Sequence, residues 1–386
     1  MKTYLVGGAV RDILMGLTPK DRDYVVVGGT PEELIEKGFK PVGAEFPVFL
    51  HPDTGEEYAL ARTERKTGPG YNGFSCQFHP GITLEEDLGR RDLTINAMAV
   101  DDSDHVVDPF DGQQDIKNEI LRHVNAEAFK EDPVRVLRIA RFSARYTYFS
   151  VHHTTLALCE EMVENGELNH LTAERVWKEF EKGMMEESPS RMFDFLWGVS
   201  ALHVILPEVA ELTDQPTTVL GNQVTDELTE TLWAMNGAAD RDASLEVRFA
   251  LLLHKLSSED IEKVCDRLKV PNDCRWLATA FQREAEYLVR ASELSADALL
   301  NTLKRVDAFR RPDRLEWLLT ARECLERIWF PMGNLCDQSE VMRLVLQAAN
   351  TVDCGAIAQA FSDKKQIPDA IHAARVEKIE SALKLI

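Results

Sequence analysis

One change of hydrophobic pattern along the chain limits the folds that its 386 residues can adopt. In the first 125 residues, short runs rich in β-branched and aromatic residues are separated by glycine and proline, which is typical of strands joined by turns. These runs lie at residues 3–6, 24–27, 47–50, 57–62 and 106–107. From Asp132 onward, apolar residues recur at the helical spacing of about 3.6 residues, and strand signals nearly vanish. The pattern predicts an α+β chain, with an α/β head followed by an all-helical remainder.

Local signals divide this outline further. Thr30 followed by Pro31 predicts the start of a helix over residues 31–37, because threonine caps a first turn and proline fits its first position. In the helical part, turn-forming residues predict breaks at 187–189, 213–225, 237–243 and 331–334. We find no internal repeat and no low-complexity segment.

The composition limits the compartment in which such a chain works. No stretch approaches the roughly 18 consecutive apolar residues of a membrane-spanning helix, and Arg11 and Asp12 come too early for a signal peptide. The seven cysteines are scattered, with no Cys-x-x-Cys pair, a usage typical of a reducing compartment and not of a disulfide or zinc framework. We therefore expect a cytoplasmic protein with no membrane partner.

The net charge is −21, from 44 Lys and Arg against 65 Asp and Glu. Taken alone, this charge argues against a nucleic-acid partner, because polyanions repel one another. The charge is uneven, however. Residues 1–100 hold 11 basic and 15 acidic side chains, residues 101–300 hold 20 and 38, and residues 301–386 hold 13 and 12. The net charge therefore hides local clusters of basic residues.

Two glycines follow the first predicted strand. The segment 7–12, Gly-Gly-Ala-Val-Arg-Asp, is expected to turn from that strand into a helix. Glycines allow backbone N–H groups to approach a ligand at the positive end of a helix, and Arg11 adds a cation. The segment is a candidate phosphate-binding turn around Gly8 and Arg11, although a strand-to-helix turn without a ligand has the same sequence.

A pair of aspartates opens the next predicted strand. Side chains two residues apart on a strand share a face, so Asp21 and Asp23 are expected to point the same way. Two carboxylates at this spacing can hold two Mg²⁺ ions across a phosphoryl group. Asp-x-Asp alone is also common in solvated turns. Its combination with the preceding glycine turn is rarer and resembles the nucleotidyltransferase fold of the DNA polymerase beta superfamily.

Three further segments sharpen this resemblance: Arg-Arg-Asp-Leu-Thr-Ile-Asn-Ala at 90–97, Asp-Pro-Phe-Asp-Gly at 108–112 and Glu-Asp-Pro-Val-Arg-Val-Leu-Arg at 131–138. The full set of motifs covers about residues 4–180 in order. It is similar to that of class II tRNA nucleotidyltransferases, the CCA-adding enzymes, and of the related bacterial poly(A) polymerases. Residues 57–66 and 70–74 are similar to the CCA-adding branch of gammaproteobacterial type.

The resemblance implies a division of the chain and a reaction. Residues 1–125 would form the nucleotidyltransferase head, 126–212 a helical neck with nucleotide- and RNA-binding helices, and 213–386 a helical body and tail that bind tRNA. The expected activity is template-independent addition and repair of the 3′-terminal CCA of tRNA from CTP and ATP, with release of pyrophosphate. Asp21 and Asp23 would be the catalytic residues that hold Mg²⁺.

The resemblance also implies which residues contact the nucleotide: Gly8, Arg11, Arg91, Asp132, Arg135 and Arg138. Asp132 and Arg135 would recognise the base. Cytosine and adenine both offer an amine donor beside a ring-nitrogen acceptor, which match a carboxylate and a guanidinium. Uracil and guanine reverse this order, and each unpaired buried group costs about 1–3 kcal/mol. Without a ligand, Asp132 before Pro133 would be a helix N-cap.

A stripe of arginines follows this pair. Arg135, Arg138, Arg141 and Arg145 recur at helical spacing, with no acidic residue from 134 to 146. The stripe predicts contacts with the triphosphate and, for Arg141 and Arg145, with tRNA phosphates; a solvated basic face is the alternative. The family-like segment 171–179 is expected to begin with Thr172 as N-cap. We expect it to brace the preceding helix by ion pairing and packing of Trp177, with no part in the chemistry.

Many bacterial relatives carry an HD phosphohydrolase domain in the second half, whose metals need a His-Asp pair. In this chain His254 is followed by Lys255, and lysine cannot ligate a divalent ion as a carboxylate does. We therefore expect no HD-domain metal and no phosphatase or phosphodiesterase activity, with His254 packed as a core residue. The chain resembles the bacterial type that lacks the HD domain.

A second basic cluster lies near the C-terminus, where Lys304, Arg305, Arg310, Arg311 and Arg314 fall within eleven residues. By resemblance, the first four are expected to bind tRNA; a solvated helix end is the alternative.

Three other functions stay open. The nearly neutral tail disfavours a poly(A) polymerase, a partial enzyme would add only CC or only A, and an RNA-binding protein on an inactive transferase scaffold is disfavoured by the intact Asp-x-Asp.

Overall fold

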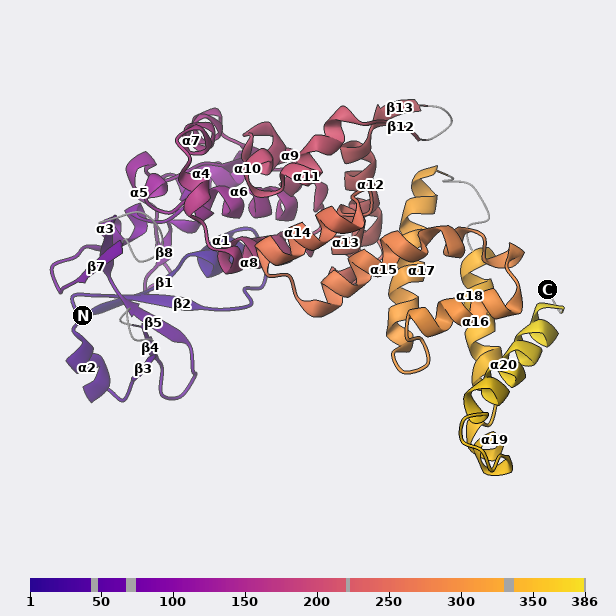
Figure 1. The fold of residues 1–386 in the computed structure, drawn as a ribbon. Helices are drawn as coiled ribbons and strands as arrows, with labels where there is room; N and C mark the ends of the chain where they lie inside the picture. The colour runs from indigo at the N-terminus through magenta and orange to yellow at the C-terminus, as the bar shows by residue number, and fades with distance from the viewer. Residues whose placement is uncertain (43–47, 67–73, 220–222, 330–336, 385–386) are drawn as a thin grey trace. The chain divides into compact units, whose positions relative to one another are not determined.

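The computed structural model describes residues 1–42, 48–66, 74–219, 223–329 and 337–384. These residues form two compact units, Met1–Gly183 with Arg191–Ile205 and Met184–Ser190 with Leu206–Ile386. Strands are concentrated in the N-terminal part of the chain, and helices follow them (Figure 1). The prediction of an α/β head followed by a helical remainder is confirmed, although the remainder is largely and not entirely helical, because it also holds short strands. The division into residues 1–125, 126–212 and 213–386 stays a prediction.

The first unit is built on a seven-stranded mixed sheet in the order β3-β4-β5-β2-β1-β8-β9. Its central strands, β1 (Lys2–Val6) and β2 (Asp23–Val27), are antiparallel, with Val6 opposite Asp23. Strand β5 (Glu57–Leu60) runs parallel to β2. The register places the start of β2 beside the end of β1, where the glycine turn begins. The other strands of the sheet are β3 (Lys40–Val42), β4 (Val48–Leu50), β8 (Ala99–Val100) and β9 (Val106–Val107).

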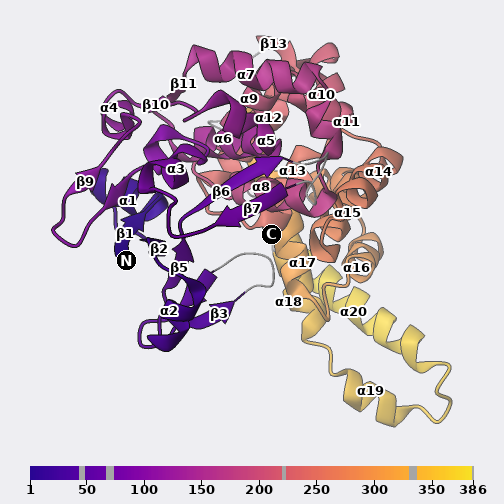
Figure 2. The same cartoon turned by 90° about the vertical axis from the view of Figure 1, so that its left-hand side faces the viewer.

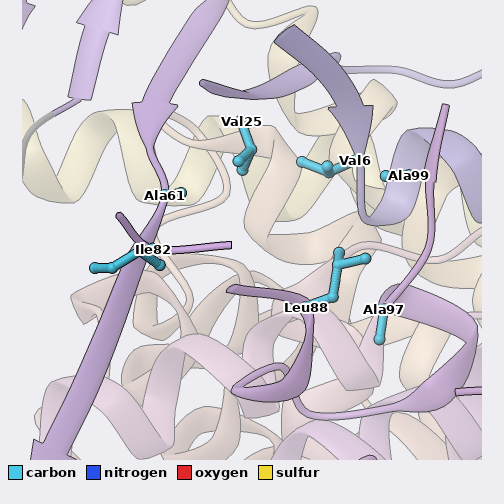
Figure 3. Close-up of a cluster of buried hydrophobic side chains, with 7 residues drawn as sticks. All are labelled: Val6, Val25, Ala61, Ile82, Leu88, Ala97 and Ala99. Atoms are coloured by element: carbon cyan, nitrogen blue, oxygen red, sulfur yellow. The ribbon is translucent and has the colours of Figure 1, made fainter. Parts of the chain in front are cut away.

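Successive valines of β2 are buried on opposite faces of the sheet, as the alternation of side chains along a strand requires. Val25 belongs to a core cluster with Val6, Ala61, Ile82, Leu88, Ala97 and Ala99 (Figure 3). Val26 packs instead with Leu34, Phe49 and Leu60. Because both faces of β2 are covered, the strand has an apolar run and not an alternating pattern.

The helices of this part of the chain are α1 (Gly8–Leu14), α2 (Pro31–Glu36), α3 (Leu84–Gly89), α4 (Gly112–Lys117), α5 (Ala126–Glu131), α6 (Val134–Arg145), α7 (His153–Glu164), α8 (Ala173–Met184), α9 (Ser190–Gly198) and α10 (Ala201–Ile205). Helix α2 was predicted from its first residues. Thr30 caps it, and Glu33 completes a reciprocal capping box. The predicted break at 187–189 lies between α8 and α9 and is confirmed.

The predicted single strand over residues 57–62 is wrong. Strand β5 ends at Leu60, and β6 (Arg62–Lys66) leaves the sheet to pair with β7 (Phe74–Phe78) in a separate antiparallel hairpin (Figure 2). Strands β3, β7 and β8 were not predicted. The two residues of β8 are too few to show a period, and Pro41 interrupts the strand signal of β3. A short parallel pair, β10 (Ile120–Leu121) and β11 (Ser150–Val151), completes this unit.

The second unit is mainly helical, with α11 (Pro207–Ala210), α12 (Glu227–Ala239), α13 (Leu245–Leu252), α14 (Ser258–Leu268), α15 (Asn272–Val289), α16 (Ala296–Arg305), α17 (Pro312–Trp329), α18 (Asp337–Asn350), α19 (Cys354–Ala360) and α20 (Ile367–Leu383). The predicted break at 213–225 contains a hairpin of β12 (Pro216–Val219) and β13 (Gln223–Asp226). The break at 237–243 begins later than predicted, because α12 continues through Gly237. The break at 331–334 lies outside the described residues. Among the described helices, none is both long and apolar enough to cross a membrane.

Candidate active site

A cavity of about 760 Å³ lies in the first unit, bounded by the β1–α1 turn, residues 90–96, α6 and α8. Every nucleotide-binding residue predicted from the sequence lines it, and so do Asp23, Arg141 and Arg145. Ten arginine and lysine side chains face four carboxylates in its wall. The cavity therefore has a strongly positive lining within an acidic chain, which suits a polyanionic ligand.

The turn at Gly7 needs glycine for two reasons. Its φ is +73°, which side chains of L-residues rarely adopt, and a Cβ there would lie 2.6 Å from Nη1 of Arg91 and would displace that guanidinium. A Cβ at Gly8 would lie 3.3 Å from Nη2 of Arg11. Both glycines thus let arginine side chains lie directly against the turn. The phosphate-binding role of Gly8 and Arg11 stays a prediction.

Arg11 is held from three directions. Its Nη1 donates to Oδ1 of Asn96 at 2.6 Å, and its Nε and Nη2 donate to Oδ1 of Asp12 at 2.9 and 2.7 Å. The guanidinium also lies 5.5 and 5.4 Å from the ring centroids of Phe142 and Tyr146. The side chain is buried and cannot swing freely, so its charge has a fixed position in the cavity wall.

Arg138 is oriented by a buried carboxylate. Its Nε donates to Oδ2 of Asp92 at 2.7 Å, while Oδ1 of Asp92 accepts from the amide of Leu93 at 2.9 Å and from Asn96 at 3.0 Å. Burial raises the pKa of Asp92, but Arg138 and the hydrogen bonds outweigh it, so the pKa lies well below its usual range. Asp92 is therefore ionised and fixes the direction of Arg138.

The predicted base-recognition pair lies at the start of α6. Oδ1 of Asp132 accepts from the amide of Val134 at 3.2 Å, and Oδ2 pairs with Arg175 at 2.7 Å. The N-cap of α6 is Pro133, one residue later than predicted. Arg135 is buried and donates to the carbonyl oxygens of Arg90 and Arg91 at 2.6 and 3.4 Å. Both side chains are thus fixed by the protein and line the cavity.

The predicted bracing role of residues 171–179 is confirmed. On α8, Oε2 of Glu179 accepts from Nε of Arg141 at 2.7 Å, with both side chains buried, and Trp177 is buried in the core. The expectation that this helix only braces is nevertheless incomplete, because Arg175, Lys178 and Lys182 also line the cavity. Residues 175, 178, 179 and 182 are spaced so that they lie on one face of a helix. This spacing was the signal in the sequence that these side chains share a surface.

Asp21 and Asp23 are both exposed, but only Asp23 lines the cavity. Both line a second hollow of about 610 Å³, together with Glu56 and Glu57. Asp21 precedes β2, so strand alternation does not set its direction. Partial burial raises the pKa of Asp23, Arg91 opposes this, and Asp21 adds to it. The described residues hold no group of three or more His, Cys, Asp or Glu arranged for a metal. Two carboxylates nevertheless fit Mg²⁺, which takes its remaining ligands from water and substrate phosphates.

His254 and Lys255 have structural roles in the second unit. The Nζ of Lys255 lies 2.9 Å from Oε2 of Glu230, a fully buried carboxylate, and 3.6 Å from Oε1 of Glu227. Nδ1 of His254 bonds the carbonyl oxygen of Leu251 at 2.7 Å, and its side chain is 6% exposed. The prediction that His254 is packed in the core is confirmed, and Lys255 compensates a buried charge.

The basic cluster near the C-terminus falls at the end of α16 and the start of α17. Arg305 donates to both carboxylate oxygens of the buried Glu284, at 2.8–3.2 Å. Lys304 contacts Nδ1 of His372 at 2.5 Å, Arg311 pairs with Asp313 at 2.9 Å, and Arg310 pairs with Asp307 at 2.7 Å. The side chain of Arg310 is 83% exposed, whereas that of Arg305 is 38% exposed.

The difference in exposure between Arg305 and Arg310 yields a prediction. Glu284 pairs with Arg283 and Arg305, each at 2.8 Å. Arg305→Ala removes one of these two arginines, so we expect a stability loss of about 1–2 kcal/mol in urea unfolding. Arg310→Ala is the matched control and is expected to change stability by less than about 0.5 kcal/mol. If Arg310 contacts tRNA, its loss lowers the slope of log K against log [salt] by about 0.7–0.9. Equal stability of the two variants would contradict the structural role of Arg305.

Two family models match the chain. Residues 3–122 match the Poly A polymerase head domain, and residues 148–213 match the probable RNA- and SrmB-binding site of polymerase A. The Multifunctional CCA protein of Burkholderia ambifaria is 48% identical over 410 residues, covering 99% of each chain. That of Azoarcus sp. is 47% identical over 402 residues, covering 99% of this chain and 97% of its own.

Solved structures share the fold. The Bacillus stearothermophilus CCA-adding enzyme in complex with CTP has a TM-score of 0.70 at 23% identity and covers 98% of this chain and 89% of its own. The Thermotoga maritima CCA-adding enzyme complexed with tRNA has a TM-score of 0.66 at 20% identity, with coverage of 99% and 90%. The similarity to the curated relatives extends over 99% of the chain. The chain therefore belongs to the family of CCA-adding enzymes, the class II tRNA nucleotidyltransferases.

Proposed function

We propose that this chain adds and repairs the 3′-terminal CCA of tRNA, using CTP and ATP without a nucleic-acid template and releasing pyrophosphate. The observation that carries this proposal is the composition of the cavity lining. It contains fixed arginines, the predicted base-recognition residues Asp132 and Arg135, and the carboxylate of Asp23. The cations suit a triphosphate, the pair suits the edge of a base, and the carboxylate suits a metal ion.

In this proposal the triphosphate lies against the Gly8 turn and is held by Arg11, Arg91 and Arg138. Because these arginines are already fixed by Asp12, Asp87 and Asp92, little reorganisation is needed when the substrate binds. Positioning and charge stabilisation then supply most of the rate, as in other phosphoryl transfers.

The family uses a divalent metal, and we propose Mg²⁺ held by Asp21 and Asp23. When two such ions are bound, one would lower the pKa of the attacking 3′-hydroxyl group and the other would neutralise charge on the triphosphate and on the leaving pyrophosphate. The carboxylates are exposed and carry the oxygen donors that Mg²⁺ prefers, and Asp23 also faces the arginine-lined cavity.

Base selection is assigned to Asp132 and Arg135, and it gives a prediction. Arg135→Ala is expected to reduce discrimination against UTP and GTP by about 10- to 100-fold, because about 1–3 kcal/mol of mismatch penalty is lost. The measurement is the ratio of kcat/KM for CTP to that for UTP. Arg145→Ala, on the same helix and cavity wall, is the control and should leave this ratio unchanged. An unchanged ratio in Arg135→Ala would remove the recognition role.

The test of the proposed function uses two tRNA transcripts, one that ends at the discriminator base and one that ends in CC. With Mg²⁺, the first is expected to incorporate CMP from CTP, and the second to incorporate a single AMP from ATP. A long tail from ATP alone on the first transcript would instead indicate a poly(A) polymerase. No incorporation on either transcript would indicate an inactive RNA-binding scaffold. The full-length identity to proteins named for CCA favours the first outcome.

We also propose that the reaction takes place in the cytoplasm. Among the described residues, Cys159, Cys265, Cys274, Cys324 and Cys354 are all free thiols. Free cysteines are typical of a reducing compartment. The proposed substrates, tRNA, CTP and ATP, are cytoplasmic molecules.

A further inference from the structure

Two lysines of the cavity differ from its arginines. Lys178 and Lys182 lie one turn apart on α8, are both exposed, and both line the cavity. Within the part of the chain that the structure describes, neither has an ion pair or a hydrogen bond to a side chain. Their positive charges therefore face the cavity without compensation.

The eight arginines of the cavity, in contrast, are all held by the protein. Arg138 and Arg141 pair with buried carboxylates at 2.7 Å, and Arg175 pairs with Asp132 at the same distance. The others are bound to Asp12, to Asp87 or, for Arg135, to backbone carbonyl oxygens. The arginines thus form a rigid wall, and the lysines are the mobile cations in front of it.

Helix α8 fixes where these mobile cations can reach. Val176, Trp177 and Phe180 are buried on its opposite face, and Arg175 and Glu179 tie the helix to Asp132 and to Arg141 of α6. The lysine stems therefore begin at a rigid surface beside the stripe of α6. Only their ends move, over roughly the length of a four-carbon side chain.

We propose that Lys178 and Lys182 bind the phosphodiester backbone at the 3′ end of the RNA primer. This inference rests on the proposed function. It adds Lys178 and Lys182 to Arg141 and Arg145, the residues of this cavity that the sequence predicts to bind tRNA phosphates.

The choice of the primer over the triphosphate follows from the motion that the reaction requires. Each incoming triphosphate must be held in the same place, which suits fixed arginines. The primer must shift by one nucleotide after each addition, so the cations that bind its phosphates must release them and bind the next ones. A strongly hydrated ammonium on a flexible stem meets this need better than a bidentate guanidinium.

The test is the double variant Lys178→Gln/Lys182→Gln, measured by tRNA filter binding and by kinetics. We expect the Kd for tRNA to rise about tenfold near 0.1 M salt, and the slope of log K against log [salt] to fall by about 1.5, as two lost phosphate contacts require. The KM for CTP should change by less than about twofold. Lys117→Gln, an exposed lysine of α4 in the same unit, is the matched control and should change neither.

Two results would overturn the inference. One is an increased KM for CTP with an unchanged Kd for tRNA, which would assign the lysines to the triphosphate. The other is a double variant identical to the wild type. Lys178→Arg/Lys182→Arg should restore tRNA affinity, which separates loss of charge from loss of folding. Binding is measured without nucleotides, so a failure of CCA addition by the wild type would refute the proposed function without affecting this test.

Discussion

Asp23→Asn is expected to abolish nucleotide incorporation, with a loss in kcat of at least about 1000-fold, which corresponds to about 4 kcal/mol of barrier. An amide oxygen has no charge with which to hold Mg²⁺ against a triphosphate, so the metal contribution of several kcal/mol is lost. Asp21→Asn should behave similarly. Because both side chains are exposed, we expect the fold and the Kd for tRNA to be unchanged.

The measurement is single-turnover incorporation of CMP, with tRNA binding determined in parallel. Asp53→Asn removes an exposed charge elsewhere in the same unit and is expected to retain the wild-type rate. A variant at Asp23 or Asp21 that keeps its turnover within tenfold of the wild type would refute the assignment of these residues to the metal.

The second large effect concerns stability. Asp92→Ala is expected to lower the free energy of unfolding by about 2–4 kcal/mol, because Arg138 loses its carboxylate and the amides of Leu93 and Asn96 lose their acceptor. Urea unfolding measures this loss. Asp102→Ala, at an exposed position, is the control and should stay within about 0.5 kcal/mol of the wild type. Equal stability of the two variants would contradict the structural role of Asp92.

The lowered pKa of Asp92 fixes the pH dependence of this difference. A carboxylate whose pKa is lower in the folded state than in the unfolded state contributes stability above the unfolded value, here 3.8. That contribution is lost as the pH falls through the lower folded value. The gap between wild type and Asp92→Ala should therefore be constant from about pH 5 to pH 8 and should narrow below about pH 4. A gap that widens on acidification would contradict this.

Much of the candidate site could be predicted from the sequence because its motifs carry rare combinations of residue types. The segments around residue 8, residue 91 and residues 135–138 are far apart in the chain, yet they line one cavity. The glycines at 7 and 8 were informative because their backbone has to accommodate arginine side chains. Such constraints admit few residue types and are therefore visible in a single sequence.

The ion-pair partners could not be predicted in the same way. Arg138 pairs with Asp92, 46 residues earlier, and Arg141 pairs with Glu179, 38 residues later. These pairs depend on how α6 packs against residues 90–96 and α8, and many other carboxylates were equally plausible from the sequence. For the same reason, the role of α8 in lining the cavity was missed, since an amphipathic helix that braces and one that binds a ligand have the same pattern.

The shortest strands were missed for a different reason. Strand β8 has two residues, and its pairing with β1 comes from tertiary structure rather than from local preference. The net charge taken alone argues against a polyanionic partner, but the sequence already showed that it hides clusters of basic residues. A net charge of −21 is compatible with a polyanionic substrate because ten basic side chains face four carboxylates in one cavity.

Sequencing the 3′ ends of a tRNA transcript after incubation with both CTP and ATP tests the central claim most directly. The transcript ends at the discriminator base, and Mg²⁺ is present. We predict ends in CCA, with synthesis halting after the third nucleotide. Ends that halt at CC, long A tails, or unextended transcripts would each contradict the claim that this chain is a complete CCA-adding enzyme.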